Sequence, residues 1–263
     1  MSWLQAGQGR PVILVHGFPL TAEMWRPQLD DVPHGWMLIA PDLPGFGESV
    51  PDPARPDAAA PATSMDDYAD AVLAVMRHLN IEQAAIGGLS MGGYVTFAIH
   101  RKAAQRFGAM LLADTRAEAD TPEGRAGREK MQAAVRADGP QAAADAMMAK
   151  LIGPRASDPA RVAVVRDLIL RNQPNGIIAA LEGLKSRPDS TPQLAQITCP
   201  TLVIVGDQDE LTPVPLSEGM ARQVRHAELV VIPAAAHLAN VEEPQAFNRA
   251  LWAFLGRLAA EHR

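Results

Sequence analysis

Short apolar runs recur along the chain, and each of them leads into a turn or a loop. Six runs are apolar on both faces of the extended chain, at 11–17, 36–47, 84–90, 108–115, 201–213 and 227–237. Continuous apolar runs that end at turn residues are typical of central strands in a parallel sheet that helices cover on both sides. The pattern therefore predicts at least six strands.

Amphipathic stretches lie between several of these runs and predict helices. They are found at 65–79, 92–107 and 244–261. Strands that alternate with helices are joined by right-handed crossovers. The order predicts an α/β fold with a doubly wound, mostly parallel sheet. The proline-rich stretch at 50–63 is interpreted as a surface loop.

The alternation stops between Asp114 and about Pro200, where the pattern is helical throughout. We expect a core made of 1–114 and 200–263, with a helical cap, or lid, at 115–199. Simple elaboration of the fold is the alternative. The insert leaves from the carboxyl end of a strand, where open α/β sheets bind ligands, and this favours the lid. An adaptable apolar substrate pocket is predicted within the cap, although the same side chains at helical spacing equally fit plain packing. Its candidate residues are Met147, Met148, Leu151 and Ile152.

Composition narrows the classes of partner and the compartment. The chain has 263 residues, 48% of them hydrophobic, and a net charge of −6 without a block of basic residues. Nucleic acid and anionic membranes are therefore not expected as partners. No leader sequence and no membrane-spanning run is recognised, and Cys199 is the single cysteine, so we expect a cytoplasmic protein without disulfides. No cysteine–histidine cluster suggests a metal, and no cofactor is predicted.

The most informative stretch is GGLSMGGY at 87–94. Gly88 to Gly92 fit the pattern G-x-S-x-G, and the pattern lies between a predicted strand and a predicted helix. In such a sharp turn the serine adopts strained backbone angles, and neighbours without a Cβ avoid a clash. Its hydroxyl is then exposed at the N-terminus of a helix, where negative charge is favoured. Ser90 is the predicted nucleophile.

A serine nucleophile needs a base and an acid that orients the base. His237 follows the last predicted strand and comes after an acidic turn, which gives the chain order serine, acid, histidine. Asp209, in the turn after the strand at 201–206, is the favoured acid. Asp114, at the end of an earlier strand, is the open alternative. His16 is expected to shape a loop rather than act as a base.

Two backbone N–H groups are candidates for an oxyanion hole. The glycine turn in HGFPL can direct the N–H of Phe18 towards the serine, and the N–H of Met91 lies directly after the nucleophile. An ordinary turn between strand and loop is the alternative for the first of them.

These motifs resemble the α/β-hydrolase superfamily, in the branch of small capped serine hydrolases that includes 3-oxoadipate enol-lactonase-like esterases. VHGFPLTAEMW, DLPGFGES, GLSMGG, VGDQDELTP and AAAHLANVEEP occur in the order of that family. The resemblance implies Ser90 as nucleophile, Asp209 as acid, His237 as base, and the Phe18 and Met91 amides as oxyanion hole. The family begins with a strand hairpin, but only about ten residues precede VILVHG, so we expect one edge strand to be missing.

The resemblance implies a cofactor-free hydrolase acting on a small carboxylic ester or lactone. A C–C bond hydrolase and a perhydrolase would use the same three residues, and a binding protein that has lost catalysis is a further alternative. A serine at position 90 disfavours dehalogenases and epoxide hydrolases, which use aspartate there. The sequence makes no prediction of oligomeric state.

Overall fold

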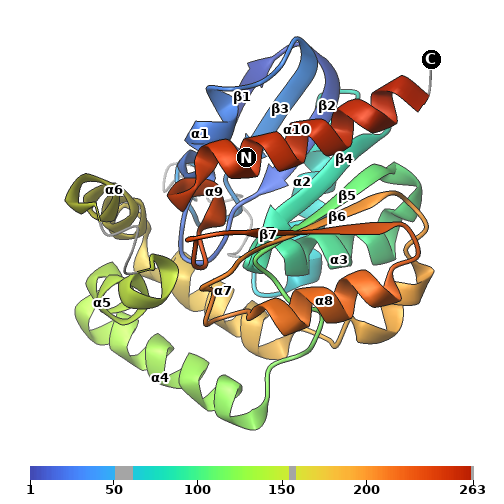
Figure 1. Cartoon of the computed structure of the whole chain (residues 1–263). Helices are drawn as coiled ribbons and strands as arrows, with labels where there is room; N and C mark the ends of the chain where they lie inside the picture. The colour runs from blue at the N-terminus through green and yellow to red at the C-terminus, as the bar shows by residue number, and fades with distance from the viewer. Residues whose placement is uncertain (51–61, 154–157, 262–263) are drawn as a thin grey trace.

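The computed structural model describes residues 1–50, 62–153 and 158–261, and these residues form a twisted sheet covered by helices (Figure 1). The sheet described has seven strands in the order β1-β3-β2-β4-β5-β6-β7. All neighbouring pairs are parallel except β1 and β3. The predicted fold class is therefore confirmed. The strands are β1 (Trp3–Gly7), β2 (Gly9–Val15), β3 (Gly35–Pro41), β4 (Ala84–Leu89), β5 (Phe107–Ala113), β6 (Thr201–Gly206) and β7 (Ala227–Ile232).

Strand β1 was not predicted from the sequence. It runs antiparallel to β3, with Trp3 opposite Pro41, and none of its five residues is fully buried. A short, half-exposed edge strand lacks the continuous apolar run that marks the central strands. Within the described residues one strand precedes β2.

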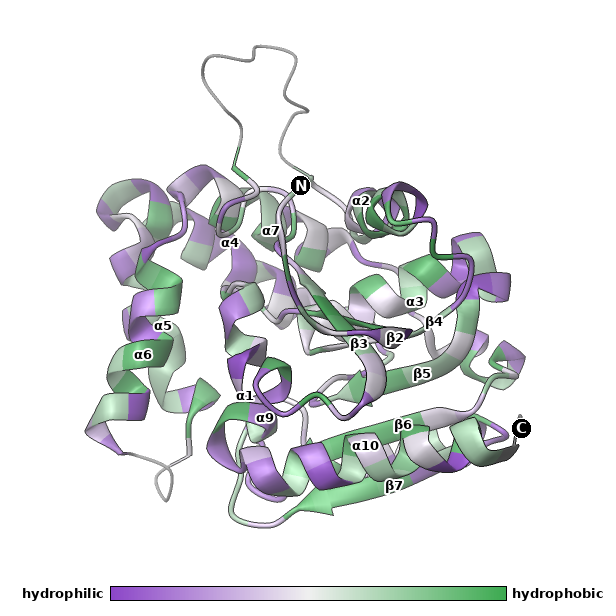
Figure 2. Ribbon diagram, turned by 90° about the horizontal axis from the view of Figure 1, so that it is seen from above, coloured by the Kyte–Doolittle hydropathy of each residue, from purple (hydrophilic) through white to green (hydrophobic). Residues whose placement is uncertain are grey.

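Helices cover both faces of the sheet (Figure 2). The helices α2 (Met65–His78) and α3 (Met91–Ala103) pack together on one face, and α10 (Pro244–Glu261) lies on the other. The helix α8 (Val214–Gln223) packs against β6 and β7. Two single-turn helices, α1 (Arg26–Leu29) and α9 (Ala239–Glu242), lie next to each other beside α10. These layers bury the central strands, as their apolar pattern requires.

Four helices, α4 to α7, are inserted between β5 and β6, where the sequence predicted a helical segment. Figure 1 shows α4, α5 and α6 beyond the edge of the sheet. Each of the four begins with a proline, a residue whose fixed φ and missing N–H suit the first turn of a helix. Most of the predicted loop at 50–63 lies outside the described residues. The inserted helices are α4 (Pro122–Asp138), α5 (Pro140–Leu151), α6 (Pro159–Leu170) and α7 (Pro174–Ser186).

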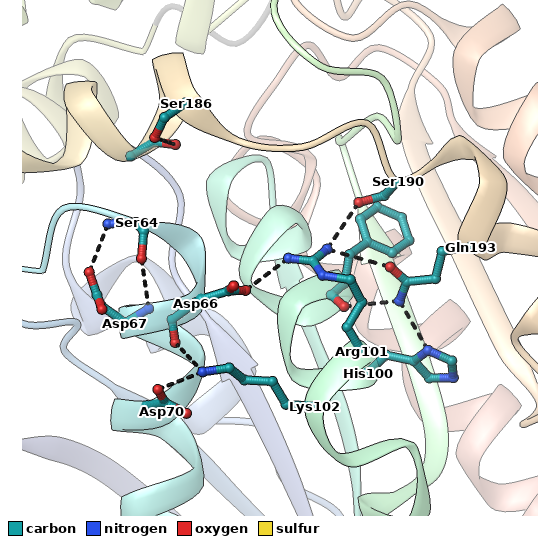
Figure 3. Close-up of polar contacts among 12 residues, drawn as sticks. Ser64, Asp66, Asp67, Asp70, His100, Arg101, Lys102, Ser186, Ser190 and Gln193 are labelled. Atoms are coloured by element: carbon teal, nitrogen blue, oxygen red, sulfur yellow. Dashed lines mark hydrogen bonds and ion pairs between the residues drawn. The ribbon is translucent and has the colours of Figure 1, made fainter.

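The chain returns from the insert to the sheet along α3 (Figure 3). The side-chain amide of Gln193 donates to the carbonyl oxygen of Phe97 at 2.9 Å and contacts Nδ1 of His100 at 3.0 Å. Arg101, on the same helix, donates to Asp66 of α2 at 2.9 Å. The Gln193 contacts fasten the end of the insert to the helix that carries Ser90 at its start, and the Arg101 contact joins that helix to α2.

In the part of the chain that the structure describes, no helix combines the length and the apolar character that a membrane crossing requires. The same residues contain no group of three or more histidine, cysteine or acidic side chains arranged to hold a metal ion.

Candidate active site

Ser90 lies in the tight turn between β4 and α3, with φ 57° and ψ −112°. A positive φ is unfavourable for a residue with a Cβ and persists only where the surroundings enforce it. The N–H of Ser90 donates to the carbonyl of Ala113 on β5 at 3.0 Å. Its own carbonyl accepts from the Gly93 N–H at 2.9 Å and from the Thr115 hydroxyl at 2.8 Å. The turn is held by the neighbouring strand on one side and by the helix on the other.

The glycines of the motif are required by close backbone contacts. A Cβ on Gly88 would lie 2.5 Å from the carbonyl carbon of Gly92, and a Cβ on Gly92 would lie 2.1 Å from the carbonyl oxygen of Val15. No larger side chain fits at either place unless β2, β4 or α3 moves. The glycine pattern therefore has a steric cause: it allows the helix to start directly over the sheet.

His237 and Asp209 come from the loops after β7 and β6 and meet at the carboxyl edge of the sheet. Nδ1 of His237 lies 2.8 Å from Oδ2 of Asp209, and the two residues are 1% and 4% exposed. A carboxylate can only accept, so Nδ1 carries the proton and Nε2 is left as a free acceptor in the neutral ring. This is the tautomer that a general base for a serine hydroxyl requires.

Asp209 is held by its own turn as well as by the histidine. Oδ1 accepts from the N–H groups of Leu211 at 2.8 Å and Thr212 at 3.0 Å, and the Thr212 hydroxyl donates to Oδ2 at 2.5 Å. Burial opposes ionisation of Asp209. The charge and hydrogen bond of His237 and the hydrogen bonds from Thr212 outweigh it, and the pKa of the carboxyl is lowered. The group is therefore a stable anion.

Asp114, the alternative acid, has a different environment at the end of β5. Its Oδ1 accepts from the N–H of Gly206 at 2.8 Å, whereas its buried Oδ2 has no hydrogen-bond partner among the described residues. Burial, and then the negative charge of Asp209, raise the pKa of Asp114 well above its usual value. The structure brings Asp209, and not Asp114, into hydrogen-bonding contact with His237.

The two predicted oxyanion donors both lie in the interior. Phe18 and Met91 are 4% and 0% exposed. Met91 is the first residue of α3, and the first N–H groups of a helix have no acceptor within it. Neither residue's N–H has an acceptor among the described residues. Phe18 lines the cavity described below, whereas Met91 is not among its described lining residues, and the oxyanion hole stays a prediction.

His16 lies beneath this loop and bonds to backbone on both sides. Its Nδ1 donates to the Gly17 carbonyl at 3.0 Å, and its Nε2 accepts from the Leu43 N–H at 3.0 Å. Burial lowers the pKa of the ring, although Asp42 and the Gly17 carbonyl oppose this. A neutral histidine with both nitrogens engaged shapes the Phe18 loop and is not free to act as a base.

A cavity of about 310 Å³ is lined by both Ser90 and His237. This volume is at the lower end of the range for small-molecule sites. Phe18 and Thr212 line it from the sheet side, and Met131, Met147 and Leu181 line it from the inserted helices. The candidate nucleophile, the candidate base and the insert thus line one cavity.

Only one of the four predicted pocket residues lines this cavity. Met147 does so, whereas Met148, Leu151 and Ile152 are not among its described lining residues. Leu151 is fully buried, and its carbonyl accepts from the N–H of Leu238 at 3.1 Å, so this end of α5 packs on the loop that carries His237. Helical spacing alone does not tell which side of α5 faces the cavity.

Sequence reasoning missed the charged side chains of the cavity. Arg116, Asp120, Arg128, Lys150 and Arg187 all line it, and so does Tyr94. The dense alternation of charges over 116–130, at the beginning of the insert, is the signal that points to the first three. Nothing local marks Lys150 or Arg187, which reach the same space from α5 and from the end of α7.

Comparison with known proteins identifies the family of the chain. The model of the alpha/beta hydrolase fold family matches residues 10–244. The chain belongs to the α/β-hydrolase family. It is 30% identical to the AB hydrolase superfamily protein YisY of Bacillus subtilis, over 92% of this chain and 90% of that protein. It is also 30% identical to 3-oxoadipate enol-lactonase 2 of Acinetobacter baylyi, over 89% of this chain and 84% of the relative.

Solved structures of α/β-hydrolases are similar over almost the whole chain. A thermophilic esterase from Thermogutta terrifontis, solved with malate bound, superposes with a TM-score of 0.91 at 37% identity and covers 98% of this chain and 93% of its own. The enol-lactonase of Burkholderia xenovorans superposes with a TM-score of 0.86 at 24% identity, with coverages of 97% and 96%, and supports the fold alone. This α/β-hydrolase is thus related to esterases and enol-lactonases.

Proposed function

We propose that this α/β-hydrolase is a serine hydrolase that cleaves small carboxylic esters or lactones through an acyl-enzyme. The observation that carries the proposal is that His237 lines the same cavity as Ser90, while Nδ1 of its buried ring lies 2.8 Å from Oδ2 of Asp209. A serine in a strained turn, a neutral imidazole and a buried carboxylate are the three groups that acyl transfer requires. Similarity to an esterase and to an enol-lactonase supports the same reaction class.

In the first half of the reaction, Oγ of Ser90 adds to the carbonyl carbon and its proton passes to Nε2 of His237. The charge on the resulting imidazolium is balanced by Asp209. The N–H groups of Phe18 and Met91 hydrogen-bond to the developing oxyanion. Collapse of this intermediate breaks the bond to the alkoxide, which takes the proton from His237, and leaves the acyl group on Ser90.

In the second half, a water molecule replaces the alcohol. His237 accepts a proton from the water as its oxygen adds to the acyl carbon, and then returns that proton to Oγ of Ser90. The free carboxylic acid leaves and the enzyme is restored. In a lactone the alkoxide stays tethered to the acyl group, so hydrolysis yields a single hydroxy acid.

The inserted helices act as the cap in this proposal. Residues from α4, α5 and α7 line the cavity, and its volume of about 310 Å³ is suited to a small substrate. Partial enclosure reduces the access of bulk water and so strengthens the hydrogen bonds to the oxyanion. The cap assignment of 115–199 and the core assignment of 1–114 and 200–263 are parts of the same proposal.

A fluorophosphonate probe tests the proposal directly, because it phosphonylates an activated serine with loss of fluoride. We expect labelling of the wild-type protein and hydrolysis of 4-nitrophenyl acetate or butyrate. Ser90→Ala should lose the labelling and at least about 10⁴-fold of the turnover. Ser186→Ala is the matched control, because that hydroxyl lies on α7 and donates to the Glu182 carbonyl at 2.9 Å. A folded protein that is neither labelled nor active would indicate the binding-protein alternative.

A further inference from the structure

The cavity around Ser90 carries an excess of positive charge. Its described lining includes four cationic side chains, and Asp120 is the one carboxylate among those lining residues. The whole chain has a net charge of −6, so this local excess does not follow from a generally basic protein. The four cations are Arg116, Arg128, Lys150 and Arg187.

Asp120 is already shared by two of the cations. Arg187 contacts its Oδ1 at 2.6 Å and Arg128 contacts its Oδ2 at 3.0 Å. Arg187 is further fixed by hydrogen bonds to the carbonyls of Leu184 and Glu118 and lies 4.2 Å from the centre of the Tyr94 ring. Burial opposes ionisation of Asp120, but the two arginines outweigh it and lower the pKa of this carboxyl. The cluster of Asp120, Arg128 and Arg187 therefore keeps a net positive charge, but both arginines are already engaged by Asp120.

Arg116 and Lys150 are the two cations without an acidic partner. Arg116 donates to the backbone carbonyl of Leu211, in the turn that also holds Asp209. This is the one hydrogen bond that the Arg116 side chain makes among the described residues. Lys150, near the end of α5, lines the same cavity, and its side chain has no ion pair or hydrogen bond in the part of the chain that is described. A cationic side chain beside a partly enclosed cavity favours an anion there, because the low-dielectric walls concentrate its field.

We propose that the substrate carries a second, free carboxylate besides the ester or lactone carbonyl, and that Arg116 and Lys150 bind this carboxylate. The proposal rests on the proposed function, because it places the carbonyl at Ser90. The cavity of about 310 Å³ limits such a substrate to a small half-ester of a dicarboxylic acid or a lactone bearing a carboxylate. Binding at one end of the substrate orients its carbonyl at the other, and this contributes to the rate as well as to affinity.

A matched pair of substrates tests the proposal. Monoethyl succinate has a free carboxylate, and in ethyl succinamate a neutral amide of nearly the same shape replaces it. The readout is the ratio of kcat/KM for the two esters, measured by ethanol release. We expect the wild-type ratio to favour monoethyl succinate by about tenfold or more, because a hydrogen bond to a charged group is stronger than one between neutral groups. The ratio should fall as ionic strength rises, because salt screens the attraction.

Variants then test which side chains bind the free carboxylate of the substrate. Lys150→Met should lower the ratio about tenfold, and Lys150→Glu should lower it further or invert it. Lys130→Met is the matched control, because Lys130 is an exposed lysine of α4 that does not line the cavity. Arg116→Gln should also lower the ratio, with Arg125→Gln as its control. Because Arg116 also bonds to the Asp209 turn, Lys150 is the decisive position.

The outcomes separate this proposal from the proposed function. Equal kcat/KM for the two esters in a wild-type enzyme that hydrolyses both would overturn the carboxylate subsite and leave the serine hydrolase intact. The same holds if both Lys150 variants keep the wild-type ratio. Loss of fluorophosphonate labelling at Ser90, with neither ester hydrolysed, would instead overturn the proposed function.

Discussion

The carboxylate of Glu242 accepts hydrogen bonds from the two backbone N–H groups that flank His237. Oε1 accepts from Ala236 at 3.0 Å and from Leu238 at 3.1 Å, while Oε2 accepts from Gly153, just beyond α5, at 2.8 Å. Glu242 is 1% exposed. Burial raises its pKa, although the three N–H groups oppose this. One buried side chain thus fixes the histidine loop and joins it to the inserted helices.

Glu242→Gln should therefore weaken both stability and turnover. The glutamine amide has one accepting oxygen, so its NH₂ group must face at least one of the three N–H donors. An unsatisfied buried donor costs about 1–3 kcal/mol, and we expect a loss of that size in the free energy of unfolding. Because the His237 loop loses an anchor, kcat for 4-nitrophenyl butyrate should also fall. Glu243→Gln, at the next position, is the control. Wild-type stability and kcat in Glu242→Gln would show that the loop does not depend on this carboxylate.

Ser90→Gly should be more stable than Ser90→Ala, although both variants lack the hydroxyl. Alanine retains the Cβ and with it the strain of φ 57°, which is of the order of 1–3 kcal/mol. Glycine removes the strain but adds roughly 0.5–1 kcal/mol of chain entropy to the unfolded state. The strain is the larger effect, so we expect a net gain of about 1 kcal/mol, measured by urea unfolding. Equal stabilities would mean that the turn is not strained.

Isosteric substitution distinguishes between the two candidate acids, Asp209 and Asp114. Asp209→Asn should lower kcat by roughly 10⁴, because the imidazole loses the acceptor that fixes its tautomer and balances its charge. Asp114→Asn should lose far less, because Asp114 makes no hydrogen bond to His237 in the described structure. Steady-state kinetics with 4-nitrophenyl butyrate measures both. If Asp114→Asn lost more activity than Asp209→Asn, Asp114 at the end of β5 would be the acid. If both variants stayed active, the proposed triad would be wrong.

Asp114→Asn should also change how stability depends on pH. In the folded protein the pKa of Asp114 is raised, so between its ordinary value near 3.9 and the raised value the folded state holds a proton that the unfolded state has lost. Stability of the wild type therefore declines as pH rises through this window. Asparagine does not titrate, and it tolerates the positive φ of 42° at this position.

The predicted result is a Tm advantage for Asp114→Asn that grows as pH is raised from 5 to 8. Thermal unfolding of both proteins across that range measures it, with Asp189→Asn, at an exposed position in a loop, as the control. An advantage that shrinks with rising pH would mean that Asp114 is ionised and stabilising in the folded state.

Much of the fold can be predicted from local patterns in the sequence. The strands at 201–206 and 227–232 lie within predicted apolar runs, and the four inserted helices lie within the segment that was predicted to be helical throughout. Strand β1 was missed because an edge strand needs backbone pairing but no continuous apolar run. The G-x-S-x-G turn was also predictable, since its geometry depends on which residues lack a Cβ within five consecutive positions.

Only the tertiary structure decided which groups meet at the carboxyl edge of the sheet. The sequence alone left Asp209 and Asp114 as alternatives, because both follow strands that end at that edge. The Thr212 turn directs one carboxylate to His237, while the other is enclosed beside Gly206. Lys150 lines the cavity that Ser90 also lines, and Glu242 binds the N–H of Gly153, which lies 89 residues away along the chain. Periodicity specifies which face of an element is buried, but the neighbour that a side chain meets there depends on how the elements pack.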